Sequence, residues 1–472
     1  MSILREALFW MLVACASYLV LVTLLYLFQL PFAFAENERL NRERAQRARL
    51  GPHRSPEAFP PVSIVIAAYN EASTIVSAVQ ACLAQRYPRL EVVVVNDGSV
   101  DETLATLRSF FDLAPTGRFH VPTLPTKQVR AVYTSVIDPR LKVVDKVNAG
   151  KADALNCGVN FARFPWVCGV DADTVLADDA LPRSIEALLG DPDALGLTSY
   201  LSITLTPERA RFVRGEKLVD RSILSNFQHL DYVRAFHNSR LAWSRFNYML
   251  CTVGAFQLWR RDILVEVGGF SGDFTCEDIE LTFRVHERCR RAGRPYRVLS
   301  LPDEVGATEG PTSVSSLIAQ RARWQRVILE TFLHYRRMLV NRRYGTVGLL
   351  GMPFYLLSEV LAPLFEQLAL LMLPLALVAH RLDWLTCLLV VGLIAVANGV
   401  LTTASLLIAD RNERTYRKRD LARLTCLAPL DFIVYRPILM WARLKGTLDF
   451  LRGDRSWHKF ERNPRHLPAT SD

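Results

Sequence analysis

The feature that most constrains this chain is an uncharged apolar stretch near its start, from Ala7 to Ala35. A helix needs about 20 apolar residues to cross a bilayer, so this stretch is long enough to span one with some tilt. Ala33-Phe34-Ala35 fits the cleavage pattern of a signal peptide, but the apolar region of such a peptide is only about 7–15 residues long. The sequence therefore predicts a transmembrane anchor within residues 1–36.

Arginines follow the anchor at once, in a basic linker over residues 37–60. Basic segments beside a span tend to stay in the cytoplasm, so we expect the N-terminus outside and the linker inside. These arginines are Arg39, Arg42, Arg44, Arg47, Arg49 and Arg54.

A second apolar region lies within residues 346–443. It divides near His380–Asp383, and the two halves are each long enough for a span. A third stretch, residues 421–441, is interrupted by Asp431 and Arg436. Two spans return the basic tail, residues 444–472, to the cytoplasm, so we expect the third stretch to be interfacial or re-entrant. The sequence predicts an integral membrane protein whose middle part, residues 61–310, faces the cytoplasm.

The net charge of +10 comes largely from basic clusters that flank the apolar runs. Such clusters fit anionic lipid head groups, and we expect membrane lipid rather than nucleic acid as a partner. The nine cysteines form no C-x-x-C pair, as expected of reduced thiols in a cytoplasmic domain.

The soluble middle, residues 61–310, alternates short apolar runs with helical segments. Strands are expected at 62–68, 90–96, 141–145 and 166–174, and a helix at 150–163. Unbroken runs of valine and isoleucine between helices are typical of a parallel sheet covered on both faces. The pattern predicts an α/β domain.

Polar residues stand where three of these strands end. They are Tyr69-Asn70-Glu71, Asn96-Asp97-Gly98-Ser99 and Asp171-Ala172-Asp173. Any one of them alone is a common turn or helix cap. Together they converge on one crevice, because ligands of parallel sheets bind beyond the carboxyl ends of the strands.

Carboxylates at such an edge are hard oxygen ligands suited to Mg²⁺ or Mn²⁺ shared with substrate phosphates. The sequence has neither a G-x-x-x-x-G-K-[ST] loop nor a G-x-G-x-x-G turn. A nucleotide diphosphate held through a divalent cation is the remaining option.

Four segments, VSIVIAAYNE, VVVVNDGSVDET, AGKADALNCG and VDADT, occur in this order. They resemble the nucleotide-sugar half of family 2 glycosyltransferases, which have the GT-A fold, a Rossmann-like and mostly parallel sheet. The resemblance implies a UDP-sugar donor and a divalent cation, Mg²⁺ or Mn²⁺. It also implies roles by position: Tyr69, Glu71 and Asp97 at the nucleoside, Lys151 at the base or diphosphate, Asp171 at the sugar or ribose, and Asp173 on the metal.

Glu277 and Asp278 stand at an expected helix start, where acids are favoured in any case. A chemical reading is that one of them takes the proton from an acceptor hydroxyl. The resemblance places the base at the last residue of a T-E-D-like motif, which matches Asp278 with Glu277 beside it, although Cys276 replaces the usual threonine. It also implies that Gly254, Ala255 and Phe256 line the acceptor site.

Residues 311–345 carry apolar side chains at helical spacing and arginines elsewhere, which predicts an amphipathic helix on the membrane surface. Within them, Gln320, Arg323 and Trp324 match the Q-x-x-R-W motif of processive family 2 enzymes such as cellulose, chitin, hyaluronan and poly-N-acetylglucosamine synthases. The resemblance implies that the indole stacks on an acceptor sugar and that the arginine binds the leaving diphosphate.

These observations favour an inverting glycosyltransferase that extends a β-linked polysaccharide and helps to export it, with accessory export subunits. Transfer of one sugar to a lipid acceptor and a non-catalytic nucleotide-binding partner protein are the alternatives. Glu359 and Glu366 lie inside an apolar run, where they either line a saccharide path or pair with arginines. The resemblance is greatest to poly-N-acetylglucosamine synthases, which usually have two N-terminal spans where this chain has one.

Overall fold

The computed structural model describes residues 2–49, 59–117, 122–204, 219–378, 383–413 and 416–454. Three predicted features lie wholly or partly outside these ranges. They are the end of the basic linker with Arg54, most of the break at 380–383, and the tail from residue 455 onward.

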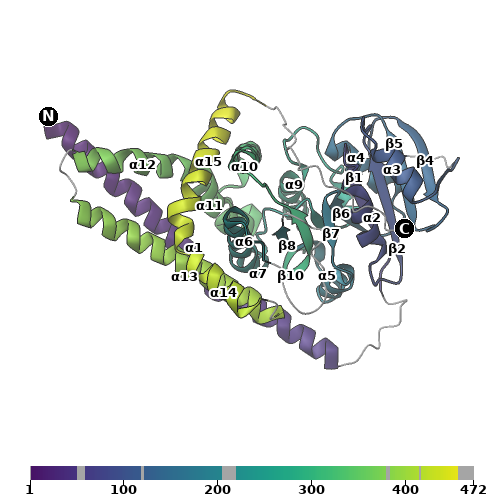
Figure 1. The fold of residues 1–472 in the computed structure, drawn as a ribbon, viewed down its shortest axis with the longest axis horizontal. Coiled ribbons are helices and arrows are strands. Elements are labelled where there is room, and N and C mark those ends of the chain that lie inside the picture. The colour runs from purple at the N-terminus through teal and green to yellow at the C-terminus, as the bar shows by residue number, and fades with distance from the viewer. Residues whose placement is uncertain are drawn as a thin grey trace.

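The described residues form one sheet of ten strands in the order β3-β4-β5-β2-β1-β6-β9-β8-β10-β7 (Figure 1). Its centre, β5-β2-β1-β6, is parallel, while β4, β9 and β7 run antiparallel to their neighbours. The GT-A fold with a parallel core is therefore confirmed, and the sheet becomes mixed away from that core. The strands are β1 Val62–Ala68, β2 Leu90–Asn96, β3 Leu113–Pro115, β4 Val129–Ser135, β5 Leu141–Lys146, β6 Trp166–Asp171, β7 Thr174–Leu176, β8 Ala194–Thr204, β9 Phe256–Arg260 and β10 Arg297–Glu309.

Helices cover both faces of the parallel core. This explains why polar and apolar residues do not alternate along β1 and β2. Successive side chains of a strand point to opposite faces. Ile64 and Ile66 pack in the cluster that contains α2 (Ile75–Leu83), and Val65 packs in the cluster of α4 (Lys151–Phe161). Gly158 lets α4 approach closely, because a Cβ there would stand 2.1 Å from a methyl group of Val65.

The other helices surround the sheet or leave it toward the apolar end. They are α1 Ser2–Arg49, α3 Thr103–Phe110, α5 Ala180–Leu189, α6 Ile223–Arg234, α7 Leu241–Arg245, α8 Arg261–Glu266, α9 Glu277–Arg291, α10 Val314–His334, α11 Met352–Tyr355, α12 Ala362–Val378, α13 Trp384–Glu413, α14 Lys418–Leu427 and α15 Arg436–Leu451. Short 3-10 turns are η4 Arg336–Met338 and η5 Arg342–Tyr344, and π-helical turns are η3 Ala235–Arg240, η6 Val347–Gly351, η7 Leu356–Val360 and η8 Asp431–Tyr435.

Among the described residues, three segments are long and apolar enough to cross a membrane: Phe9–Arg47, Val347–Val378 and Trp384–Arg411. The corresponding helices α1, α12 and α13 pack together and extend to one side of the sheet (Figure 1). The stretch expected to be interfacial or re-entrant is a bent pair, Lys418–Leu427 and Asp431–Leu451, with 53° between its halves. Such a bend fits either a broken span or a re-entrant loop.

The two acids inside the apolar region are both paired with arginines of the bent segment. Glu366, which is 4% exposed, accepts from Arg436 at 2.6 Å. Glu359 meets Arg443 at 3.1 Å. Of the two interpretations of these acids, a saccharide path or pairing with arginines, the structure shows the pairing. Pairing is expected there because an unpaired charge within an apolar span would be costly.

α15 lies directly against α10, the helix of the Q-x-x-R-W motif. The two backbones touch at Gly446, where a Cβ would stand 2.2 Å from the carbonyl oxygen of Ala322. Arg326 of α10 is only 5% exposed and donates to the carbonyl of Asp454 at 2.5 Å. α15 and the residues after it thus cover part of the arginine-bearing side of α10.

The close approach at Gly446 leads to a stability prediction. Gly446→Ala should lower the apparent melting temperature of the protein in detergent, because the added methyl overpacks a helix contact at a cost of about 1–3 kcal/mol. Gly392→Ala in α13 is the matched control, since a Cβ there meets nothing within 4 Å. Equal melting temperatures for the two variants would contradict the close contact.

Candidate active site

Asp97 organises the loop that leads into α4. Its carboxylate is 2% exposed and accepts from Lys146 Nζ at 2.5 Å, from the backbone N–H of Ala149 at 3.1 Å and from that of Gly150 at 2.8 Å. These bonds fix the start of α4 and therefore the place of Lys151, its first residue. The contact between Asp97 and a nucleoside stays a prediction.

The loops after β1 and β2 are tied to each other, which brings Tyr69 and Glu71 beside Asp97. Asn70 has a left-handed backbone with φ of 56°. Its N–H donates to the Ser99 hydroxyl at 3.0 Å, and its side-chain oxygen accepts from a backbone N–H of the same loop, that of Val100, at 2.9 Å. Tyr69 is 38% exposed at this edge, whereas Glu71 is buried.

Lys151 joins the end of β6 to the start of α9. Its ammonium lies 2.7 Å from Asp171 Oδ1 and 3.0 Å from Glu277 Oε1. Burial lowers the pKa of Lys151, but the negative charges of Asp171, Glu277 and Asp278 outweigh it, and the pKa is raised well above its ordinary value. The lysine therefore stays positive and holds residues from distant parts of the sequence together.

Gly254 stands inside this charged cluster. Its N–H donates to Asp278 Oδ2 at 2.8 Å. A Cβ at this position would lie 2.9 Å from Lys151 Nζ and 3.0 Å from Asp278 Oδ2, so glycine allows the close approach. Of the predicted acceptor segment only Gly254 reaches the acids here, since Ala255 and Phe256 are buried in the core at the start of β9.

The pKa of Asp278 is raised to about 6, chiefly by burial and then by the negative charge of Glu277. Lys151 and the N–H groups of Ile279 and Gly254 oppose this rise. A carboxylate with a pKa near neutrality is well matched to accept a proton and release it again.

Asp173 lies in the turn after β6 and accepts from the Thr308 hydroxyl at 3.4 Å. Within the described ranges no three histidine, cysteine or acidic side chains gather into a complete metal site. A carboxylate in this position nevertheless fits Mg²⁺ or Mn²⁺, because these ions take much of their coordination from substrate phosphates and water. The assignment of such an ion to Asp173 stays a prediction.

α10 is attached to the loop before the acid pair. Glu330 of α10 accepts from the backbone N–H of Thr275 at 3.0 Å. Burial and the charges of Asp278 and Glu277 raise the pKa of Cys276, and the positive charges of Arg323 and Lys151 oppose that rise. Arg323 therefore lies within electrostatic reach of Cys276, the residue before the two acids. Gln320 lies one turn earlier on α10, and its side-chain oxygen is buried without a hydrogen bond.

Trp324 is half-buried on α10. Its neighbours are side chains to which the sequence alone assigned no role. The Arg321 guanidinium stands 4.3 Å from the centroid of the indole, and the Tyr232 ring lies 6.3 Å from it at 45°. Tyr232 belongs to α6, a region without a recognisable chemical motif.

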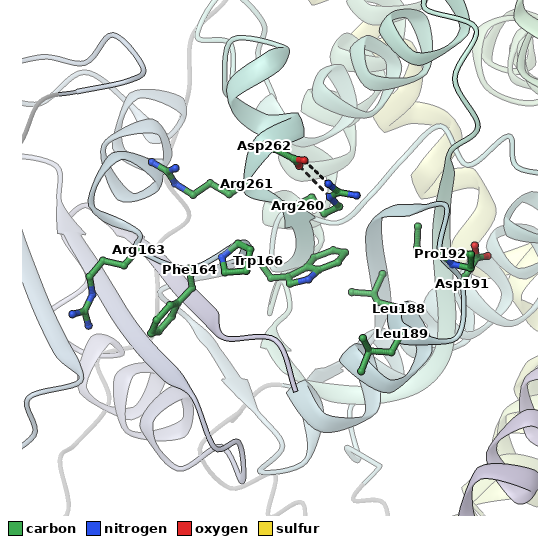
Figure 2. A pocket seen from close by; sticks show the side chains of 12 residues that line it. Arg163, Phe164, Trp166, Leu188, Leu189, Asp191, Pro192, Arg260, Arg261 and Asp262 are labelled. Carbon is green, nitrogen blue, oxygen red and sulfur yellow. Dashed lines mark hydrogen bonds and ion pairs between the residues drawn. The ribbon is translucent and has the colours of Figure 1, made fainter. Parts of the chain in front are cut away.

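A cavity of about 620 Å³ opens at the opposite end of β6 (Figure 2). Trp166 lies at its centre, Leu188 and Leu189 line one side, and Arg260 is paired with Asp262. None of the predicted site residues lines it, so it is separate from the charged cluster.

Comparisons with known proteins relate this chain to glycosyltransferases. The model "Glycosyl transferase family 2" matches residues 63–267, and "Glycosyl transferase family group 2" matches residues 166–398. The two matches together cover residues 63–398, so this part of the chain carries the sequence of a family 2 glycosyltransferase domain.

Two curated relatives are poly-beta-1,6-N-acetyl-D-glucosamine synthases. The protein of Staphylococcus epidermidis is 27% identical over 264 residues, which cover 56% of this chain and 53% of that protein. The protein of Staphylococcus aureus is 26% identical over 308 residues, covering 65% of this chain and 61% of the relative. The chain thus matches little more than half the length of these relatives.

A solved mannosyltransferase, PcManGT from Pyrobaculum calidifontis in complex with GDP-Man and Mn²⁺, has the same fold. The two superpose with a TM-score of 0.55 at 18% identity, over 93% of this chain and 99% of the other. At this identity the likeness concerns the fold alone.

The raised pKa of Asp278 leads to a prediction about pH. If the carboxylate must be ionised to act, kcat/KM should rise with pH through an apparent pKa near 6, since kcat/KM reports the free enzyme. Glu277→Gln should move this limb to lower pH, because it removes a negative charge that raises the pKa. Initial rates between pH 4 and 8, a range of about 2 units on either side of that pKa, would measure this limb for the wild-type protein and for the variant. A limb that stays in place in the variant would contradict the coupling.

Proposed function

We propose that the protein is an inverting glycosyltransferase that extends a β-linked polysaccharide from a UDP-sugar. One observation carries the proposal: Lys151, Asp171, Glu277, Asp278 and Gly254 meet within hydrogen-bonding distance at the strand ends, with Arg323 nearby. A carboxylate with a raised pKa thus lies beside Lys151, a cation suited to a diphosphate.

The reaction that fits this arrangement is a single displacement. Asp278 accepts the proton of an acceptor hydroxyl while that oxygen bonds to C1 of the donor sugar. The bond from C1 to the diphosphate oxygen breaks in the same step, and UDP leaves with the electron pair. Attack opposite to the leaving group inverts the configuration at C1, which gives a β-linkage from an α-linked donor.

The remaining residues bind and orient. Tyr69, Glu71 and Asp97 would hold the nucleoside side of the crevice, and Asp171 the sugar or ribose. Arg323 offers a planar fork to the diphosphate. A divalent cation bound at Asp173 would supply charge neutralisation for the leaving group.

Trp324 supports chain extension rather than a single transfer. A flat indole gives an acceptor sugar an apolar face to stack on while an adjacent residue binds the departing UDP. Since both curated relatives are named poly-beta-1,6-N-acetyl-D-glucosamine synthases, we propose N-acetylglucosamine as the transferred sugar.

We place the catalytic domain on the cytoplasmic side of a bacterial inner membrane. Arginines on the last turns of α1 and on η4 and η5, just before the second candidate span, support this orientation. The product would leave through the membrane region, with accessory subunits assisting its export.

The role of Asp278 is tested by substitution. Asp278→Asn should reduce transfer by about 10²–10⁴-fold, because the amide cannot take the proton, while UDP binding persists. The control is Asp273→Asn, at an exposed acid of the preceding loop. Sugar transfer from labelled UDP-N-acetylglucosamine and UDP binding by calorimetry would be measured together. Normal turnover in Asp278→Asn would refute the assignment of the base.

A further inference from the structure

We infer that Asp231 of α6 and Arg321 of α10 are positioning residues that fix the indole of Trp324 for the acceptor. The inference rests on the acceptor role proposed for Trp324. It assigns a function to residues of α6 that carry no recognisable motif.

Arg321 is the direct neighbour of the indole. It precedes Trp324 by three residues, so both side chains lie on one side of α10. Its guanidinium stands 4.3 Å from the indole centroid and 5.8 Å from the ring centroid of Tyr232. A guanidinium over an aromatic face is attracted by the ring quadrupole, and the attraction grows where water is excluded.

Asp231 holds that guanidinium in place. Its Oδ2 lies 2.9 Å from Arg321 Nη2, and its Oδ1 lies 2.9 Å from Arg234 Nη2. Arg234 is also paired with Asp431 of η8, at 3.0 Å. Both oxygens of Asp231 are therefore engaged, and the Arg321 side chain is only 11% exposed.

A third element completes the arrangement. The hydroxyl of Tyr435, which lies in η8, accepts from Arg321 at 3.4 Å. Arg321 is thus held from α6 and from η8 while it lies on an indole of α10. A buried ion pair generally adds little net stability, so geometric specificity is the better reason for this one.

This arrangement leads to an expectation for the acceptor site. If Asp231 releases Arg321, the guanidinium can leave the indole, and Trp324 is then less fixed. The donor side of the site, with Lys151 and Asp171, does not depend on this pair. Loss of the pair should therefore weaken acceptor use and chain extension while leaving donor binding unchanged.

The experiment compares Asp231→Asn with Asp431→Asn in the full-length protein in lipid. Asp431→Asn is the matched control because it breaks a buried pair with Arg234 but leaves Arg321 on Asp231. The measurements are the product length from a labelled donor that the wild-type protein uses, the KM for that donor and the affinity for UDP. Trp324→Ala is measured alongside.

For Asp231→Asn we expect shorter products and a rate of sugar incorporation lower by up to about 100-fold, the loss that a misplaced contact can cause, with an unchanged donor KM. Asp231→Glu should restore part of the length, and Asp431→Asn should resemble the wild type. Arg321→Lys, which keeps the charge and loses the planar fork, should also shorten the product at an unchanged melting temperature. This variant decides the outcome if Asp231→Asn does not fold.

Equal effects of Asp231→Asn and Asp431→Asn, or a shift in donor KM or UDP affinity, would overturn the positioning role. If Trp324→Ala shortens the product but neither Asp231→Asn nor Arg321→Lys does, the inference fails and the proposed function stands. If Trp324→Ala leaves product length unchanged, the acceptor role of the indole fails first.

Discussion

The ion pairs of Lys151 are the interaction on which the rest of the site depends. Its ammonium contacts Asp171 from the end of β6 and Glu277 from the start of α9, at 2.7 and 3.0 Å. Without a cation there, Asp171, Glu277 and Asp278 would repel one another in a partly buried place. The same cation limits how far the pKa of Asp278 rises, so that this carboxylate, the proposed base, can be ionised near neutral pH.

Two sets of contacts hold this charged cluster in place. From the sheet side, Asp97 fixes the loop before α4 with a buried lysine and two backbone N–H groups. From the apolar side, α15 packs against α10 at Gly446, and Arg443 bonds both Gln325 of α10, at 3.1 Å, and Glu359. The segments proposed to lie in the membrane thus pack against α10, the helix of the Q-x-x-R-W motif.

Much of the fold could be read from the sequence, because buried parallel strands leave a direct signal. The valine run of β2 predicted the parallel core of the sheet, and the polar residues after β1, β2 and β6 predicted the edge at which the charged cluster lies. The network around Arg321 could not be read in this way. It joins α6, α10 and η8, which are far apart in the sequence. No sequence motif around Asp231 marks it as part of such a network. The partial cover of the arginines on α10 likewise depends on tertiary packing, since helical spacing does not show what packs against a face.

We propose that this protein by itself both transfers a sugar and extends the polymer. The most direct measurement incubates the purified protein in lipid with Mg²⁺ or Mn²⁺ and a panel of labelled UDP-sugars, and sizes the products on a gel. We expect a polymer from UDP-N-acetylglucosamine that disappears when the divalent cation is chelated. A product that carries a single sugar on lipid, or no product from any donor despite UDP binding, would contradict the claim.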